Sequence, residues 1–299
     1  MDADRTLLSR RAAGKLLLAA GTMATLPAKG WAAGPGNRVV CVSKQINEFI
    51  FDIGAQSHLV ARDLTSIYPP QIVKLPSVGY HRALSAEGII SMRPSVLLTD
   101  GNVGPDPVLA QVRSVGIPVE TMEPGQTPAS AQQLMLKLGA YFHREQAART
   151  IVARWQQEMK AALAEMGRYA GLPKPRVLMI HFGQIGNSYL GLTRGSAADQ
   201  IITWAGGVNA LDQQGGMARL TPEAIARAAP DIIIATDVGY DRYGSPEKFR
   251  NLPGVALTPA ARSLRIHRVL ESEIMYFTPR TPASLRKLAG WFHPGRTSG

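Results

Sequence analysis

Two stretches of this sequence match in residue type at nearly every position: Leu84-Ser85-Ala86-Glu87-Gly88-Ile89 and Leu220-Thr221-Pro222-Glu223-Ala224-Ile225. Each continues to a proline, Pro94 in the first case and Pro230 in the second, and then into a short apolar run. The offset between corresponding positions is the same from the first leucine to the proline. A repeat of this kind indicates that one structural unit occurs twice in the chain.

Each stretch is also typical of a helix start. Ser85 and Thr221 are residue types that accept a hydrogen bond at the N-cap. Glu87 and Glu223 fall in the first turn, where the helix dipole favours a carboxylate. Many α/β proteins contain one such helix start, whereas a matched pair followed in each case by an apolar strand predicts two related lobes.

Short apolar runs alternate with helical patterns along most of the chain, which is typical of α/β units around a largely parallel sheet. Within this pattern, the expected strands are 38–43, 59–62, 96–99, 117–120, 176–181 and 231–235, and the expected helices are 47–54, 85–91, 108–115, 197–205 and 222–228.

A long helical pattern from Ser130 to about Gly167 separates the two halves, and Pro173 and Pro175 follow its end. We therefore expect an α/β fold of two Rossmann-like lobes joined by one long α-helix. The predicted N-terminal lobe covers 37–140, the linking helix 141–172 and the C-terminal lobe 173–295. Since one helix is a stiff connection, we expect the lobes to close only slightly.

The first residues read as an export signal. Arg10 and Arg11 precede an apolar stretch over 16–26, and Gly30-Trp31-Ala32 offers the small residues that a signal peptidase reads. The arginine pair also resembles a twin-arginine signal. At about 11 residues the stretch is shorter than the ~20 needed to span a bilayer. We expect a signal peptide over 1–32, cleaved near Ala32 or Ala33, and a periplasmic mature protein.

Charge and cysteine content narrow the function classes. The formal net charge is +11, of which +3 lies in 1–32, so the mature chain carries +8. A basic surface attracts anions, and an exported chain without a Lys/Arg-rich run or a nucleic-acid motif favours an anionic small molecule over nucleic acid. Cys41 is the only cysteine, which excludes an internal disulfide.

Several blocks of the sequence carry a family resemblance: 65–69 (TSIYP), 75–88 (LPSVGYHRALSAEG), 195–199 (GSAAD), 205–209 (AGGVN) and 252–259 (LPGVALTP). On these blocks the chain resembles the class III periplasmic binding proteins, and within them the haem-binding branch that serves haemin ABC transporters. The resemblance implies a monomeric carrier of ferric haem that is not an enzyme. It also implies docking on an inner-membrane ABC permease, which works with its ATPase, through Glu87 and Glu223.

The resemblance assigns haem iron to Tyr68. Phenolate oxygen is a hard donor suited to ferric iron, and haem proteins do use an axial tyrosine. Without the surrounding motif, the sequence would favour an ordinary turn tyrosine that packs on its own lobe, and the motif reverses that preference. Arg82 and Arg242 are candidates for the haem propionates, because a guanidinium can bind two carboxylate oxygens. The spacing around Arg242 departs from the family pattern.

His181 is expected to end the first strand of the second lobe, at a cleft edge. Some relatives use a histidine of this lobe as an iron ligand or hold two stacked haems, so His181 is a candidate ligand for a second haem iron. The alternative is a strand-end histidine that is hydrogen-bonded to the backbone. The number of haems, one or two, stays open.

Three other functions compete with haem transport. A carrier of ferric siderophore or cobalamin would use the same two-lobed scaffold without needing Tyr68. An exported hydrolase is disfavoured because the chain has no G-x-S-x-G, no H-E-x-x-H and no Cys-based site. A haem redox protein is disfavoured by the absence of C-x-x-C-H.

Overall fold

The computed structural model of the protein describes residues 38–182 and 189–295, so the predicted signal peptide over 1–32 lies outside the described residues. In the N-terminal lobe a four-stranded sheet has the order β2-β1-β3-β4, and every pairing is parallel. Its strands are β1 (Val39–Cys41), β2 (Leu59–Arg62), β3 (Val96–Thr99) and β4 (Val119–Thr121), and its helices are α1 (Lys44–Asp52), α2 (Ala86–Ser91) and α3 (Asp106–Ser114).

The sheet of the C-terminal lobe is mixed. The strand order is β10-β9-β5-β6-β8, and β7 also pairs with β5. The pairings among β5, β7, β9 and β10 are parallel, whereas β6 pairs antiparallel with β5 and β8. These strands are β5 (Arg176–Phe182), β6 (Tyr189–Leu192), β7 (Val208–Asn209), β8 (Met217–Leu220), β9 (Ile232–Thr236) and β10 (Ile266–Val269). The predicted largely parallel α/β architecture is confirmed, with an antiparallel part that the sequence did not indicate.

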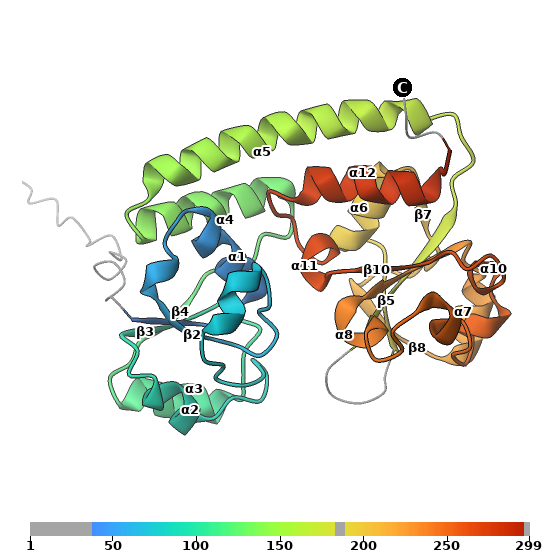
Figure 1. Cartoon of the computed structure of the whole chain (residues 1–299). Coiled ribbons are helices and arrows are strands. Elements are labelled where there is room, and N and C mark those ends of the chain that lie inside the picture. Colours follow the sequence, from blue (N-terminus) through green and yellow to red (C-terminus); the bar gives the residue numbers. More distant parts are fainter. Residues whose placement is uncertain (1–37, 183–188, 296–299) are drawn as a thin grey trace, which may run out of the picture. The chain divides into compact units, whose positions relative to one another are not determined.

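The helical pattern after Ser130 is divided into α4 (Pro128–Tyr141), which belongs to the N-terminal lobe, and α5 (Glu145–Met166), which is the one long helix that joins the lobes. The break falls at His143, whose φ of 54° is not helical. The buried residues of α5 recur every three or four positions and form one apolar stripe: Ala148, Val152, Trp155, Met159, Ala162 and Met166. This stripe packs on α4 and on α12 (Thr281–Phe292), which belong to different lobes (Figure 1).

The core continues from one lobe to the other through α5. Phe49 of α1, Trp155 of α5 and Phe277, which precedes α12, belong to the same buried cluster. Residues 34–299 accordingly form one compact unit. Among the described helices, none is long and apolar enough to cross a membrane.

The helix starts of the repeat have the predicted caps. The Ser85 hydroxyl accepts a hydrogen bond from the Gly88 N–H at 3.0 Å, and the Thr221 hydroxyl accepts one from the Ala224 N–H at 3.2 Å. The helices that follow are α2 and α7 (Pro222–Ala228), and their first turns carry Glu87 and Glu223.

The remaining helices of the C-terminal lobe are short, apart from α6 (Ala197–Trp204), which begins at its predicted first residue. They are α8 (Asp237–Tyr240), α9 (Pro246–Phe249), α10 (Pro259–Arg262) and α11 (Glu271–Ile274). α8 begins directly after β9 and α11 begins one residue after β10, so both bring polar side chains to the carboxyl edge of the sheet.

Candidate functional site

Polar and charged residues follow the carboxyl ends of the parallel strands in both lobes. Lys44 begins the helix after β1, and Asp63 and Thr65 follow β2. In the other lobe, Asp237 follows β9 and Glu271 follows β10 after one residue. Open α/β sheets bind their ligands at this edge, so these residues define a candidate ligand site.

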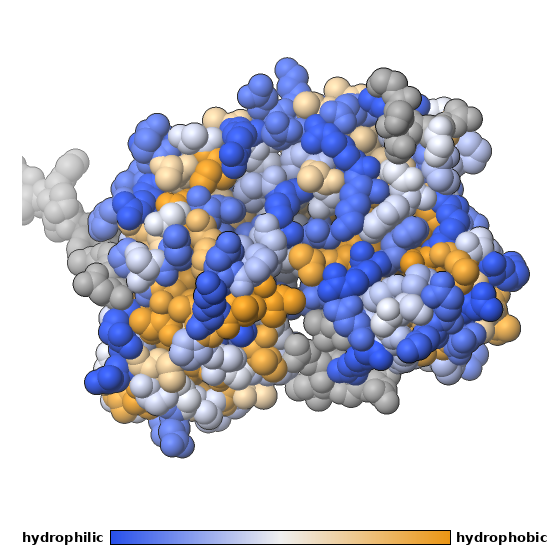
Figure 2. All heavy atoms as spheres, in the orientation of Figure 1, coloured by the Kyte–Doolittle hydropathy of each residue, from blue (hydrophilic) through white to orange (hydrophobic). Residues whose placement is uncertain are grey.

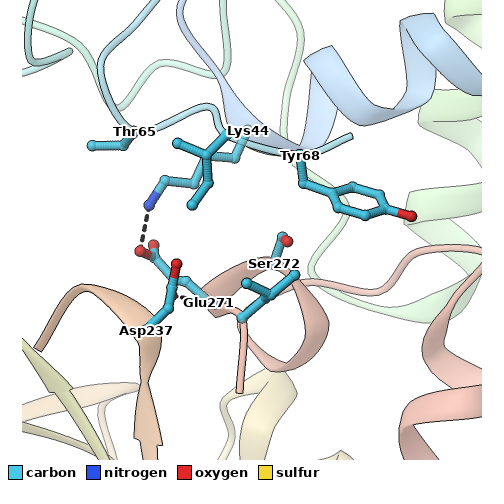
Figure 3. Close-up of a pocket in the computed structure, with 8 residues that line it drawn as sticks. Lys44, Thr65, Tyr68, Asp237, Glu271 and Ser272 are labelled. Atoms are coloured by element: carbon cyan, nitrogen blue, oxygen red, sulfur yellow. Dashed lines mark hydrogen bonds and ion pairs between the residues drawn. The ribbon is translucent and has the colours of Figure 1, made fainter. Parts of the chain in front are cut away.

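Lys44 and Glu271 form an ion pair that joins the two lobes (Figure 3). Both side chains are nearly buried, with 12% and 10% exposure. The backbone N–H of Glu271 donates to Asp237 Oδ1 at 2.9 Å, which fixes the start of α11. Burial raises the pKa of Glu271, but the Lys44 ammonium, together with the nearby imidazoles of His181 and His81, outweighs burial and holds that pKa below its ordinary value.

Two neighbouring pockets flank this ion pair, and Lys44, Thr65 and Glu271 line both of them. We call the two pockets together the cleft. The narrower pocket, about 20 Å³, is also lined by Ile67, Tyr68, Asp237, Leu270 and Ser272. The wider pocket, about 160 Å³, is also lined by Tyr80, His81, Arg82, Asn102, His181, Leu190, Met217, Met275 and Tyr276.

Tyr68 lies at the narrower pocket, at the start of the 3-10 segment η2 (Pro70–Lys74), and is half-buried. Its side chain extends away from the Lys44–Glu271 pair (Figure 3). Burial raises the pKa of Tyr68, while the nearby Arg280 cation acts in the opposite direction. The apolar residues around it in the chain are exposed, Leu64 at 49% and Ile67 at 42%.

Apolar side chains gather over the N-terminal lobe on the face seen in Figure 2. Leu64, Ile67 and Val73, in the segment that carries Tyr68, are exposed. Of these, Ile67 lines the narrower pocket together with Tyr68, which gives that pocket the mixed apolar and polar lining that is usual for a small-molecule site.

His181 lies at the wider pocket, next to the last residue of β5. Its Nδ1 is 3.3 Å from the Thr236 hydroxyl, so its partner is a side chain at the end of β9 and not a backbone group. Burial lowers the pKa of His181, which favours the neutral imidazole. A neutral imidazole is the form that ligates metals.

A second polar group lies on the N-terminal side of the cleft. His81 Nδ1 is 3.6 Å from the carboxylate of Asp63, and His81 Nε2 is 3.4 Å from the amide nitrogen of Asn102. Burial raises the pKa of Asp63, but hydrogen bonds from His81, Ser66 and Thr65 together lower it below its ordinary value. Asp63 is therefore an ionised, buried anchor for the Thr65–Tyr68 segment.

The other residues singled out from the sequence fall in different places. Arg82 is exposed and lines the wider pocket together with His181. Arg242 is exposed on the turn after α8 and lines neither pocket of the cleft. Glu87 and Glu223 are exposed, each in the first turn of its helix and away from both pockets.

Sequence reasoning did not identify Lys44, Glu271 or Arg280. The position of Lys44 directly after a strand was a usable signal, because strand ends line the cleft in this kind of sheet. Arg280 had no such signal: its guanidinium carbon lies 3.7 Å from the centroid of the Tyr68 ring, a contact between residues far apart in the chain. Within the described residues, no group of three or more His, Cys, Asp or Glu side chains could hold a metal ion.

The protein has two α/β lobes and a supporting helix packed on both of them. A polar cleft lies at the carboxyl ends of their strands. This arrangement defines a binding protein for a small solute. A family model described as periplasmic binding protein matches residues 39–269, and the chain belongs to that family. Members of this family are periplasmic solute carriers that deliver their ligands to ABC permeases.

Among solved structures, the chain is similar to the periplasmic heme-binding protein RhuT from Roseiflexus sp. RS-1, with 31% identity and a TM-score of 0.76 over 85% of this chain and 97% of that one. It is similar to the periplasmic heme-binding protein BhuT in complex with two hemes, with 30% identity and a TM-score of 0.74 over 85% and 97%. A periplasmic heme binding protein from Pseudomonas aeruginosa has 27% identity and a TM-score of 0.77 over 87% and 93%.

The names of curated relatives indicate a different ligand. The Vitamin B12-binding protein of Yersinia pestis (strain Pestoides F) is 25% identical over 228 residues, which are 76% of each chain. The Vitamin B12-binding protein of Photorhabdus laumondii is 28% identical over 147 residues, so the match spans about half of either protein: 49% of this chain and 51% of the relative.

Proposed function

We propose that this protein binds ferric haem and delivers it to an ABC permease. The observation that carries the proposal is the cleft itself, which brings Tyr68 of one lobe and His181 of the other to two pockets that share Lys44, Thr65 and Glu271. Tyrosine and histidine are both axial ligands of haem iron in proteins. The names of RhuT, BhuT and the Pseudomonas protein support the same ligand.

The charges of the cleft suit a dicarboxylate porphyrin. Lys44 and Arg82 contribute positive charge, and Arg82 is exposed enough to meet a propionate at the mouth of the wider pocket. Tyr68 takes the iron of a first haem, and His181 takes that of a second where two are bound. Arg242 lies outside the cleft lining, so we assign the propionate contact to Arg82.

Haem entry requires the lobes to separate. The wider pocket measures about 160 Å³. A pocket that encloses a drug-sized ligand needs roughly 300 Å³ or more. The Lys44–Glu271 pair, which closes the cleft in this structure, therefore parts when haem binds.

We also propose how the protein reaches the periplasm and where it delivers its haem. Residues 1–32 direct export and are removed, and the mature chain acts as a monomer in the periplasm. Glu87 and Glu223, one on each lobe, meet the permease, which its ATPase drives. The protein catalyses no reaction.

Cobalamin is the second candidate, favoured by the names of the curated relatives. A haemin titration of the mature protein, followed by absorption spectra, decides between them, with Tyr68→Phe and His181→Ala alongside and with cyanocobalamin as competitor. We expect a saturable ferric spectrum that changes in Tyr68→Phe, and a plateau that counts one haem or two. Binding of cyanocobalamin without binding of haemin would replace haem by cobalamin as the ligand.

A further inference from the structure

Arg280 lies just before α12 in the C-terminal lobe and is held by two bonds to the N-terminal lobe. Its Nε and one terminal nitrogen donate to the two carboxylate oxygens of Glu48 in α1, both at 2.7 Å. The same terminal nitrogen donates to the Ser272 hydroxyl at 2.9 Å. The Glu48 side chain is only 2% exposed. Because the pair is bidentate and its carboxylate is buried, the guanidinium plane has a fixed orientation.

That guanidinium lies over the ring of Tyr68. The carbon at the centre of the guanidinium lies 3.7 Å from the ring centroid. A guanidinium whose edge is hydrogen-bonded to a carboxylate can still stack its face on an aromatic ring. Arg280 therefore connects three parts of the chain: its own segment of the C-terminal lobe, α1, and the loop that carries Tyr68.

Anchoring of the lobes alone does not explain this arrangement. Arg286, in α12, makes a comparable bidentate pair with Glu165 of α5, with both distances 2.8 Å, and it is more exposed than Arg280. That pair joins a lobe to the long helix. The contact with the Tyr68 ring distinguishes Arg280 from Arg286.

We propose that Arg280 is a positioning residue for Tyr68, whose guanidinium, fixed by Glu48, sets the orientation of the phenol ring for iron ligation. This inference rests on the proposed function, because it assumes that Tyr68 ligates haem iron.

The first test needs no haem. The protein is labelled with 3-fluorotyrosine, and the Tyr68 signal is assigned from its absence in Tyr68→Phe. We expect Arg280→Met to shift and broaden the fluorine resonance of Tyr68, while the matched control Arg286→Met leaves it in place. An unchanged Tyr68 signal in Arg280→Met would overturn the positioning role.

The second test measures haem release from the loaded protein to excess apomyoglobin. Because a cation stacked on a ring contributes modestly, we expect Arg280→Met to accelerate release about tenfold and to alter the ferric spectrum, with Arg280→Lys between it and the wild type. Release and spectrum that match those of Arg286→Met would overturn the inference.

A third variant guards against misfolding. Arg280→Met leaves Glu48 as a buried carboxylate without its partner, so the double variant Glu48→Gln/Arg280→Met, which removes both charges of the pair, should show the same fast release. If the wild-type protein binds no haemin, the proposed function fails, while the fluorine measurement still reports whether Arg280 holds the ring.

Discussion

The ammonium of Lys44 and the carboxylate of Glu271 meet across the cleft, with little solvent access to either group. Lys44 is the first residue of α1 and Glu271 the first of α11, so one ion pair joins the helix starts of two lobes. Their positions follow from topology, since both helices begin where a parallel strand ends. The same pair lines both pockets of the cleft.

Glu271→Gln should destabilise the protein by about 2–4 kcal/mol, because it leaves the nearly buried Lys44 ammonium without its ion-pair partner. The double variant Lys44→Met/Glu271→Leu removes both charges and should recover most of that loss. Urea unfolding of the wild type, Lys44→Met, Glu271→Leu and the double variant gives the coupling energy. Additive losses in the double variant would show that the pair does not act as a unit.

The double variant should also bind ligand faster than the wild type. If the ion pair holds the cleft closed by about 1–2 kcal/mol, its removal raises the association rate of haemin about fivefold to thirtyfold. Stopped-flow mixing with haemin measures this rate. A rate equal to that of the wild type would mean that the Lys44–Glu271 contact does not limit entry.

The imidazole of His267 stacks on Trp291, with ring centroids 4.3 Å apart and planes 6° apart. Burial first, and then the Arg265 charge, lowers the pKa of His267 to about 4. Because the unfolded chain takes up this proton near pH 6.5 and the folded chain does so only near pH 4, stability falls as the pH falls through that window.

We expect this histidine to account for about 1–2 kcal/mol of stability lost between pH 7.5 and pH 5, after allowance for its partial exposure. His267→Phe keeps a ring on Trp291 and cannot take up a proton, so its unfolding free energy should change less over that range. Chemical denaturation at the two pH values measures the difference. Equal losses in both proteins would contradict the low pKa of His267.

Much of the fold follows from short-range patterns in the sequence. The strand Val96–Thr99 and the helix Pro222–Ala228 have the predicted bounds, because apolar β-branched runs and capped helix starts are local signals. The antiparallel strands β6 and β8 were not predicted, since they are short and their burial depends on partners distant in the chain. The break at His143 was missed because Tyr141 and Phe142 continue the apolar pattern.

The site was only partly predictable. Tyr68 and His181 were found from a motif and from a strand end, and the structure places both at the cleft. Arg280 was not found, because its contacts with Glu48 and Tyr68 join segments that no spacing rule connects. Arg242 was chosen for its place after a strand, but the short helix α8 intervenes and leaves it exposed and outside the cleft lining.

Gly254 has a φ of 80° and lies against the backbone of Pro222, the first residue of α7. A Cβ atom at this position would collide with the Pro222 backbone, which cannot move without shifting α7. We expect Gly254→Ala to cost about 3 kcal/mol or more. Gly244 is the matched control, since its φ is 76° with nothing within 4 Å of an added Cβ. Gly244→Ala should therefore cost only about 1 kcal/mol. Equal midpoints in thermal unfolding would contradict the close approach to Pro222.

Glu223 is an exposed carboxylate in the first turn of α7. Its own backbone N–H and the Thr221 hydroxyl stabilise the carboxylate and lower the pKa of Glu223, so the group is a fixed surface anion at neutral pH. If Glu87 and Glu223 meet the permease, Glu87→Lys/Glu223→Lys should abolish stimulation of the transporter ATPase in proteoliposomes, with haemin affinity within about twofold of the wild type.

Glu247 offers the matched control for this charge reversal. It lies in the first turn of α9, is exposed, and has its pKa lowered in the same way by its own N–H and by the Ser245 hydroxyl. Glu247→Lys changes the net charge of the C-terminal lobe by the same amount as Glu223→Lys. Because Glu247 is not proposed to meet the permease, Glu247→Lys should leave ATPase stimulation intact. Equal loss in the control would reduce the effect to overall charge, whereas full activity of the double variant would remove Glu87 and Glu223 from the docking surface.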